Sequence, residues 1–587
     1  MDGLINFTPF LIFVFKINQK MNRILKGFVI MIALALVSTT TFSQTSVKEP
    51  LPNGWYLQDL KDNGVNGISL DKAYQFVKGK KSKTVLVAVI DSGVDTLHED
   101  LKEVLWHNPK EIPGNGIDDD KNGYVDDIYG WNFIGGKDGR NVTVDSYERD
   151  RVYHAYKNKY EDKNIDPSKL SKEEAAEYEM WSKAREEMYG SSDGPEIDIA
   201  ILKVAYENLA KSDSILQIAL GKKEFTGKEL EKAELNDLKA MNAKNALYGL
   251  MKANEALEIT NKEFMGGFKD FVDGEQRKAD AKELAPKNYR DDIVKDNYKD
   301  FNDKYYGNNN VFVDNKAAFH GTHVSGIIGA KRKNKIGIDG VADNVKIMTV
   351  RAVPDGDEHD KDIALAIRYA VDNGAQVINM SFGKSFSPEK KWVDEAVEYA
   401  KSKGVLLVHA AGNDSKNVDT LWNFPNAVYQ EDKKRASNWI TVGASGDLSI
   451  DQVSPEGVKY NSLTAGFSNY GKNEVDVFAP GMKIYSTIPG GNTYGNAQGT
   501  SMASPVVAGV AALILEYYPN LSAEQVKYVI ENSTVAPPSD ITVPGSDKKV
   551  KLSEISKSGG VINAYEALKL AATLKGERTT GNQLKPF

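Results

Sequence analysis

The chain has 587 residues, a formal net charge of −8 and no cysteine. Its length and its hydrophobic content of 41% are enough for the cores of more than one domain. The acidic balance without a basic cluster excludes a general nucleic-acid-binding role, and the lack of cysteine excludes disulfides, thiol catalysis and thiolate metal sites.

The first 43 residues have the layout of a targeting sequence. Arg23 and Lys26 precede an apolar run at 27–37, and small residues follow up to Ser43. This arrangement predicts a secretory signal peptide that begins at Met21. The run is shorter than the ~18 residues that a membrane span needs. We therefore expect an exported protein, periplasmic or extracellular, with a membrane anchor as the weaker alternative.

A buried strand is expected over residues 83–90, where the apolar side chains run without a break. Unbroken apolarity is typical of a strand that is covered on both faces of a parallel sheet. The strand leads into Asp91-Ser92-Gly93. This places a carboxylate at the carboxyl edge of the sheet, where ligands gather in open α/β folds. An aspartate that merely caps the next turn is the alternative.

An acidic loop follows, with oxygen-bearing side chains at alternate positions: Asp118, Asp120 and Asn122. This spacing is the opening half of a calcium-binding loop. The glutamate that such a loop carries at its twelfth position is replaced by Tyr129, and we expect Asp126 or Asp127 to substitute for it. We predict a structural calcium site here, with a solvated acidic turn as the alternative.

Residues 146–310 differ from the chain on either side. Charged residues, alanine and tyrosine dominate, and glycine becomes rare. Apolar residues recur at helical spacing, as at Ile197, Ile201 and Val204, which predicts three or four amphipathic helices in a hairpin or small bundle. No catalytic pattern occurs in this insertion. Its expected role is to restrict access to the cleft at the carboxyl edge of the sheet and to stabilise the fold, with a docking surface for a partner protein as the alternative.

The α/β pattern resumes after residue 310. Residues 319–326 read as the start of a helix that carries His320, a side chain suited to moving protons near neutral pH. Strands and helices then alternate, which implies a mostly parallel sheet covered by helices. The expected strands are 345–350, 377–381 and 405–411, with helices near 361–373 and 388–403.

Residues 499–505, Gly-Thr-Ser-Met-Ala-Ser-Pro, precede a second long apolar run at 506–515. The glycine permits a tight turn, and Pro505 is tolerated in the first turn of a helix. We therefore expect Ser501 at the start of a buried helix, in the positive field of its N-terminus. A serine that only caps a core helix is the alternative for this stretch alone.

Together these motifs resemble those of the subtilisin-like serine proteases, the subtilases. The matching segments, in chain order, are 91–95, 319–326, 379–383, 410–413 and 499–505. Asp, then His, then Ser is the chain order of the catalytic residues in subtilisin. The resemblance covers about residues 53–145 and 311–573 and implies a three-layer α/β fold with a mostly parallel central sheet and an inserted helical subdomain.

The resemblance also implies roles for individual residues. Ser501 is the expected nucleophile, His320 its general base and Asp91 the group that orients the base. Asn413 is the expected side-chain donor of the oxyanion hole. An extended peptide is expected to bind along the residues Ser381, Phe382, Gly383, Ala410, Ala411 and Gly412.

The implied activity is that of an exported serine endopeptidase working through an acyl-enzyme, with a peptide or protein substrate and no organic cofactor. The alternatives are an inactive peptide-binding scaffold and a serine esterase. Asp100 matches a carboxylate ligand of the family's calcium site, although the neighbouring loop matches only at Asn334. The implied division is a signal segment 1–43, a catalytic domain from 44–145 and 311–573, the insertion 146–310 and a polar tail 574–587.

Overall fold

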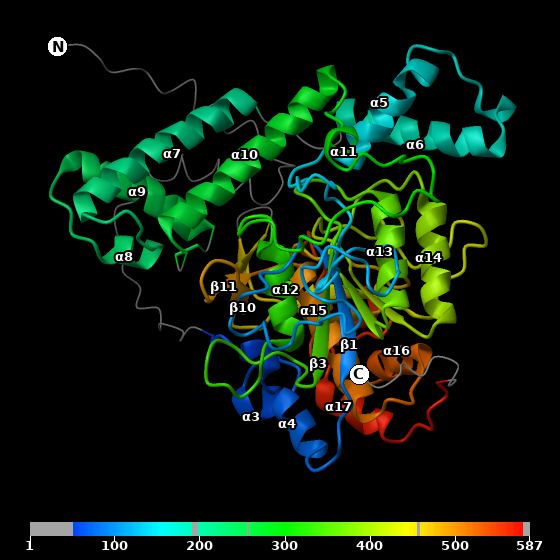
Figure 1. The fold of residues 1–587 in the computed structure, drawn as a ribbon. Coiled ribbons are helices and arrows are strands. Elements are labelled where there is room, and N and C mark those ends of the chain that lie inside the picture. The colour runs from blue at the N-terminus through cyan, green and yellow to red at the C-terminus, as the bar shows by residue number, and fades with distance from the viewer. Residues whose placement is uncertain (1–50, 191–197, 255, 258, 455–457, 579–587) are drawn as a thin grey trace, which may run out of the picture. The chain divides into compact units, whose positions relative to one another are not determined.

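Seven strands form one central sheet in the computed structural model, which describes residues 51–190, 198–254, 256–257, 259–454 and 458–578. The strand order is β2-β3-β1-β4-β5-β6-β9, and every neighbouring pair is parallel. Figure 1 labels two of these strands, β1 and β3. The prediction of a mostly parallel α/β sheet is confirmed. The strands are β1 (Val85–Asp91), β2 (Gly130–Asn132), β3 (Val345–Arg351), β4 (Val377–Met380), β5 (Leu406–Ala410), β6 (Trp439–Ser445) and β9 (Val477–Pro480).

The described chain divides into two compact units. One unit spans Arg149–Pro286, and the larger one runs to Glu148 and resumes at Lys287. The predicted signal segment 1–43 lies outside the described residues, as do residues 579–587 of the predicted tail.

Strand β1 shows why the larger unit has three layers. All seven of its residues are buried. Val85, Val87 and Val89 belong to one apolar cluster, with side chains of α12 (Phe319–Gly329) and α15 (Thr500–Tyr517). Leu86, Ala88 and Ile90 belong to a second, with side chains of α13 (Asp360–Asp372) and α14 (Lys390–Ser402). Because successive side chains of a strand point to opposite faces, helices cover both faces of the sheet.

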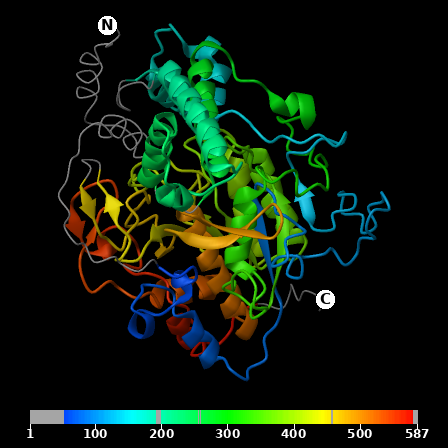
Figure 2. The same cartoon turned by 90° about the vertical axis from the view of Figure 1, so that its left-hand side faces the viewer.

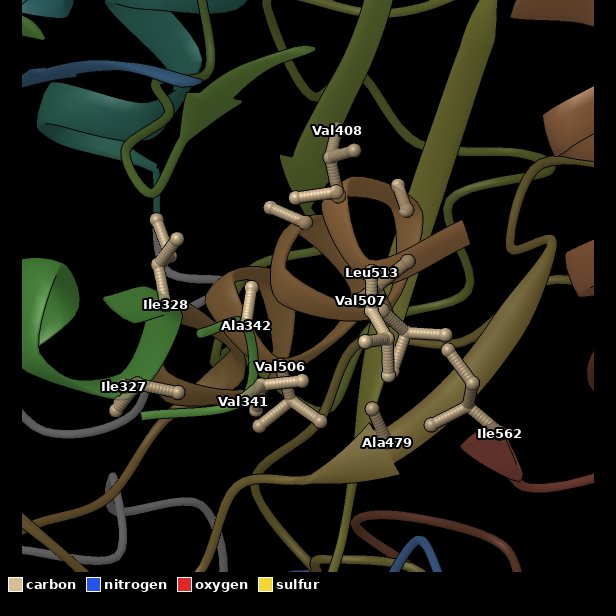
Figure 3. Close-up of a cluster of buried hydrophobic side chains, with 14 of the residues drawn as sticks. Ile327, Ile328, Val341, Ala342, Val408, Ala479, Val506, Val507, Leu513 and Ile562 are labelled. Carbon is tan, nitrogen blue, oxygen red and sulfur yellow. The ribbon is translucent and has the colours of Figure 1, made fainter. Parts of the chain in front are cut away.

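Helix α15 runs through the first of these clusters (Figure 3). Its small residues allow close packing: a Cβ at Gly509 would lie 2.6 Å from Cβ of Val341. Among the described residues, α15 is the one helix whose length and mean hydropathy would suffice to cross a membrane. Since 89% of that stretch is buried inside the fold, it is accounted for as a core helix.

A hairpin of β10 (Ile484–Ile488) and β11 (Thr493–Ala497) covers α12 (Figure 2). Ser486 Oγ donates to the carbonyl of His323 at 2.7 Å, and Thr487 Oγ1 donates to the carbonyl of Thr322 at 2.8 Å. The remaining elements of the larger unit are η1 (Trp55–Leu57), α3 (Leu60–Asn63), α4 (Leu70–Phe76), α11 (Tyr289–Ile293), β7 (Gln452–Val453), β8 (Lys459–Tyr460), α16 (Ala523–Asn532), β12 (Ile541–Thr542), β13 (Lys549–Val550), η4 (Leu552–Glu554) and α17 (Ala564–Ala571).

The smaller unit is helical throughout its described length. Side chains of α7, α9 and α10 form its main apolar cluster, which includes Leu216, Leu247 and Phe268. Capping boxes at Ser171, Thr226 and Thr260 start three of the helices. The helices are α5 (Glu148–Tyr160), α6 (Lys172–Tyr189), α7 (Ile199–Leu220), α8 (Gly227–Lys232), α9 (Leu238–Ala253) and α10 (Asn261–Glu283), with a 3₁₀ turn η2 (Pro167–Lys169).

The described part of this unit has six α-helices, more than the three or four expected. The prediction missed α5 and α6 because they lack the aliphatic periodicity on which it relied. They are rich in charge, and α6 buries Trp181, Ala184 and Met188 in place of an aliphatic stripe.

Residues 287–310, which were expected in the insertion, belong to the larger unit. A buried ion network fastens them. Arg290 donates to both carboxylate oxygens of Asp362, at 2.6 and 2.8 Å, and its Nε lies 2.6 Å from Asp296 Oδ1. Lys361 pairs with Asp296 at 2.7 Å, and the Tyr306 hydroxyl donates to Asp362 at 2.5 Å. Charged residues here are therefore part of a core, which a pattern of apolar residues does not reveal.

We predict that Arg290→Met strongly destabilises the protein, because it leaves two buried carboxylates without this partner. Breaking a buried pair from one side costs about 3–5 kcal/mol of unfolding free energy. Denaturant unfolding measures this. The matched control is Arg140→Met, since Arg140 pairs with Asp138 and Asp292 on the surface, where little change is expected. Similar losses for the two variants would contradict the prediction.

Candidate active site

Asp91 and His320 form a close pair at the carboxyl edge of the sheet. Asp91 ends β1, and His320 is the second residue of α12. The ring Nδ1 lies 2.8 Å from Asp91 Oδ1 and 3.0 Å from Oδ2. Burial of the ring opposes its charged form, but the Asp91 carboxylate outweighs this, so the pKa of His320 is raised. About a third of the His320 side chain, 36%, remains exposed, which leaves the ring accessible.

Two glycines allow α12 to begin this close to β1. A Cβ on Gly321 would lie 2.2 Å from the carbonyl oxygen of Gly93 and 3.2 Å from Asp91 Oδ1. Gly93 itself has φ +113°, which a side chain would strain. The glycines in the two sequence motifs are thus required by the approach of helix to strand.

His323, one turn further along α12, has a different environment. It is fully buried, and its Nε2 lies 3.0 Å from the carbonyl of Ile484. Burial lowers its pKa to about 4, so the ring is neutral near pH 7. This histidine packs the helix against the β10–β11 hairpin.

Arg351, which the sequence analysis did not single out, lies opposite Asp91 in the register of β3 and β1. It is fully buried. Its Nε donates to the carbonyl of Ser92 at 2.9 Å, and its other nitrogens donate to Asn132 Oδ1 at 3.0 Å and the Val142 carbonyl at 2.6 Å. Burial lowers its pKa to about 10. The guanidinium therefore fixes the backbone directly after Asp91. The signal in the sequence that could have pointed to this role is a basic residue at the end of an apolar strand.

Ser501 lies in the first turn of α15, and hydrogen bonds join that turn to the end of β4. Ser501 Oγ donates to the carbonyl of Ser381 at 3.0 Å, and Ser381 Oγ donates to the carbonyl of Ser501 at 2.9 Å. Behind them, Ser504 Oγ donates to Asn379 Oδ1 at 2.8 Å, and Asn379 Nδ2 donates to Ser381 Oγ at 3.0 Å. The serine hydroxyl thus points at Ser381 in this conformation, and reaching the His320 ring requires it to reorient.

The Asn413 side chain is oriented by Thr500. Asn413 Oδ1 accepts from the Thr500 backbone N at 2.8 Å and from Thr500 Oγ1 at 3.0 Å. The amide nitrogen consequently faces the other way. A Cβ built on Gly499 would lie 3.4 Å from Asn413 Nδ2 and 3.6 Å from both Asn413 Oδ1 and the Ser501 backbone N. The amide side chain and the backbone nitrogen of the serine are therefore close to each other.

The predicted peptide-binding residues follow the ends of β4 and β5, which are adjacent parallel strands. Ser381, Phe382 and Gly383 come directly after β4, and Ala410, Ala411 and Gly412 end or follow β5. His409 Nε2 lies 2.7 Å from the Phe382 carbonyl and so ties the two segments together. All the predicted catalytic and peptide-binding residues thus occur at carboxyl ends of strands or N-terminal turns of helices.

In the acidic loop, Asp118 and Asp120 come together with Glu111, which the sequence analysis did not name. One carboxylate oxygen from each of the three lies within 4.8 Å of the others. This all-oxygen donor set suits a hard cation such as calcium. Asp126 lies outside this group, and its two oxygens accept from the backbone N of Gly114 and of Gly116, each at 2.8 Å.

Asn122 shapes the same loop. Its Oδ1 accepts from the backbone N of Tyr124 at 2.8 Å, and its Nδ2 donates to Asp127 at 3.1 Å. The spacing therefore picked out two of the three grouped carboxylates, Asp118 and Asp120, but not Glu111, which precedes the motif.

Asp100 lies outside this group of carboxylates. It is fully buried, and its Oδ1 accepts from Asn334 Nδ2. Its Oδ2 accepts from the Tyr494 hydroxyl at 3.1 Å and from the Ile338 backbone N at 3.2 Å.

Sequence comparisons place these features in a family. The sequence model of the subtilase family, Peptidase_S8, matches residues 82–561. Thermitase of Thermoactinomyces vulgaris is 38% identical over 246 residues, which cover 41% of this chain and 77% of thermitase. The thermophilic serine proteinase of Bacillus sp. (strain AK1) is 45% identical over 196 residues, 33% of this chain, and the alignment spans only 42% of that relative.

Among solved structures, a protease from Pseudoalteromonas arctica PAMC 21717 is 29% identical, over 43% of this chain and 70% of that one. The TM-score of 0.33 is too low to establish a shared fold, so the assignment depends on the sequence comparisons. Since the family model spans most of the chain and includes Asp91, His320, Asn413 and Ser501, the chain belongs to the subtilase family.

Proposed function

We propose that this chain is an exported serine endopeptidase in which Ser501 attacks the peptide carbonyl, His320 moves the proton and Asp91 orients the imidazole. The observation that carries the proposal is the Asp91–His320 pair, with Nδ1 2.8 Å from Oδ1. The serine-bearing turn of α15 is joined to the end of β4, at the same carboxyl edge of the sheet. Membership of the subtilase family supports the reaction class. Export is proposed on the signal-like segment alone.

Each group has a distinct task. A serine hydroxyl is a weak nucleophile until a base accepts its proton, and His320, with Nδ1 held by Asp91, presents its other ring nitrogen for this. The same ring then protonates the leaving amine, which completes formation of the acyl-enzyme. Asp91 keeps the ring in the correct tautomer and stabilises the imidazolium. Water releases the acyl group by the same proton transfers in reverse order.

The negative oxygen of the tetrahedral intermediate needs donors already in place. Asn413 Nδ2 and the Ser501 backbone N supply them, because Thr500 occupies the amide oxygen of Asn413. In subtilisin, a family member, removing one such donor lowers turnover by about 10²–10³-fold.

The substrate is proposed to be a polypeptide that binds in an extended conformation along Ser381-Phe382-Gly383. An esterase would not need this backbone pairing, and an inactive scaffold would not need the Asp91–His320 pair. Hydrolysis of casein compared with that of a short ester separates the endopeptidase from the esterase.

A fluorophosphonate probe tests the nucleophile. We expect it to label the wild-type enzyme and the control Ser553→Ala, a change at an exposed serine. Ser501→Ala and His320→Ala should remain unlabelled, because the first lacks the nucleophile and the second lacks its base. Labelling that persists in Ser501→Ala would overturn the assignment.

The pH dependence of kcat/KM tests the role of Asp91. His320 acts as a base only when it is neutral, so activity rises with pH through its pKa, which Asp91 raises. Asp91→Asn removes that charge, so the acid limb of the profile should move to lower pH. Turnover should also fall by about 10⁴-fold, because the tautomer is no longer fixed. A fall in rate with an unmoved acid limb would show that the Asp91 charge does not set this pKa.

We also propose a structural calcium ion held by Glu111, Asp118 and Asp120. A ligand that binds only the folded state adds about 2.7 kcal/mol of unfolding free energy at a hundred times its Kd. The melting temperature should therefore fall in chelator, and Glu111→Gln with Asp118→Asn should abolish that response and calcium binding by calorimetry. Asp100→Asn is the matched control and should retain the response. A calcium response lost only in the control would assign the ion to Asp100.

A further inference from the structure

Lys384 carries a buried ammonium directly after the segment that is proposed to pair with substrate. Its Nζ donates to Glu148 Oε2 at 2.7 Å and to the carbonyl of Glu358 at 2.8 Å, and it lies 2.8 Å from Asp360 Oδ1. The side chain is 1% exposed. An ammonium has three hydrogens to donate, so these three oxygens match its full capacity. The charge is therefore paired inside the protein and has a fixed position.

Backbone hydrogen bonds hold the same residue. The Lys384 N–H donates to the carbonyl of Phe424, and the Phe424 N–H donates to the carbonyl of Lys384, each at 2.8 Å. The preceding residue is Gly383, and a glycine backbone has more conformational freedom than that of any other residue type. The order of the segment up to Gly383 therefore depends on what holds Lys384.

The two carboxylates that bind this ammonium are themselves fixed. Asp360 is the first residue of α13. Its Oδ1 accepts from Ser387 Oγ at 3.0 Å, and its Oδ2 accepts from the backbone N of Glu389 at 2.8 Å. A carboxylate at a helix N-terminus is also stabilised by the helix dipole. Glu148 is held through its backbone N, which donates to Asp357 Oδ2 at 2.8 Å. Both carboxylates thus act as fixed anchor points.

The first turn of α13 binds both chain connections that lead into and out of the helical unit, and these connections are part of the larger unit. Through Lys384, Asp360 is linked to Glu148, the last residue before the helical unit. Asp362 binds Arg290, which lies on the returning connection. One turn of helix therefore fastens the proposed substrate segment together with both connections.

We propose that Lys384 is a positioning residue for substrate binding, held by its two carboxylate partners. The Ser381 carbonyl accepts from Ser501 Oγ, so the segment is fixed at the serine end without Lys384. The end at Gly383 is farther from the serine, and it pairs with more remote residues of an extended peptide. The ammonium therefore acts on those residues of the substrate. This inference rests on the proposed endopeptidase activity.

Peptide amides with a chromogenic leaving group test this role through kcat/KM. They carry the same P1 residue and either one or four residues on the acyl side. The wild-type enzyme should cleave the longer substrate faster, because it adds backbone hydrogen bonds to the segment. Lys384→Met should lower kcat/KM for the long substrate by about tenfold, the effect of one lost hydrogen bond, and leave the short substrate near the wild-type value. Glu148→Gln should cause a smaller loss of the same kind, because its amide oxygen still accepts from the ammonium.

Lys390→Met is the matched control. Lys390 also binds a carboxylate, that of Asp394, and a backbone carbonyl, that of Val428, but on α14. This variant should keep the wild-type dependence on substrate length. Equal losses for the short and the long substrate in Lys384→Met would show a merely structural effect and overturn the positioning role.

Active-site titration with the fluorophosphonate probe keeps the two hypotheses apart, since it counts working sites whatever the substrate length. A wild-type enzyme that the probe does not label would refute the proposed function. Labelled Lys384→Met with an unchanged dependence on length would overturn only the role of Lys384. If Lys384→Met fails to fold and shows no titratable sites, Glu148→Gln decides: a selective loss on the long substrate supports the role, and a wild-type dependence on length overturns it.

Discussion

Because β1 runs between β3 and β4 with every residue buried, a slip of one residue in its register would exchange the side chains of two separate cores. That exchange would turn the valines that pack against α12 and α15 toward α13 and α14 instead. The register of β1 is thus fixed by packing along its whole length. Asp91 is the last residue of this strand, so the position of its carboxylate is a consequence of apolar packing.

The same strand positions the histidine. The contact between Gly93 and Gly321 holds the first turn of α12 against the end of β1, and Arg351 bonds to the carbonyl that follows Asp91. The carboxylate therefore has little freedom to turn away from the ring. At the serine, two hydrogen bonds between Ser381 and Ser501 hold the first turn of α15 against the end of β4 in the same way. The proposed catalytic groups are held by short local contacts on a rigid scaffold.

The sequence was sufficient for four adjacent strands, β3, β1, β4 and β5, and for the helices that pack on them, because unbroken apolar runs and glycine-containing turns are local signals. Strands β2, β6 and β9 were not predicted. Glu111 was missed because it lies before the loop motif and reaches the loop only in the folded chain. Arg290 and Asp362 were assigned to different segments, since nothing in a run of charged residues shows that two of them are buried together. The catalytic assignment and the calcium site stay predictions.

The order of the strands has a consequence for how the chain reaches its active form. In the central sheet, β1 pairs with β3 and β4, and both of these strands follow the helical unit in the sequence. During synthesis β1 therefore emerges first and cannot form its sheet hydrogen bonds until β3 and β4 are also present. The helices of residues 149–286 make contacts that are closer in sequence, and such contacts form faster. The helical unit is therefore able to fold while β1 is still unpaired. Asp91 and Ser501 come from opposite ends of the larger unit, so the proposed catalytic groups come together only after α15 has packed against the sheet.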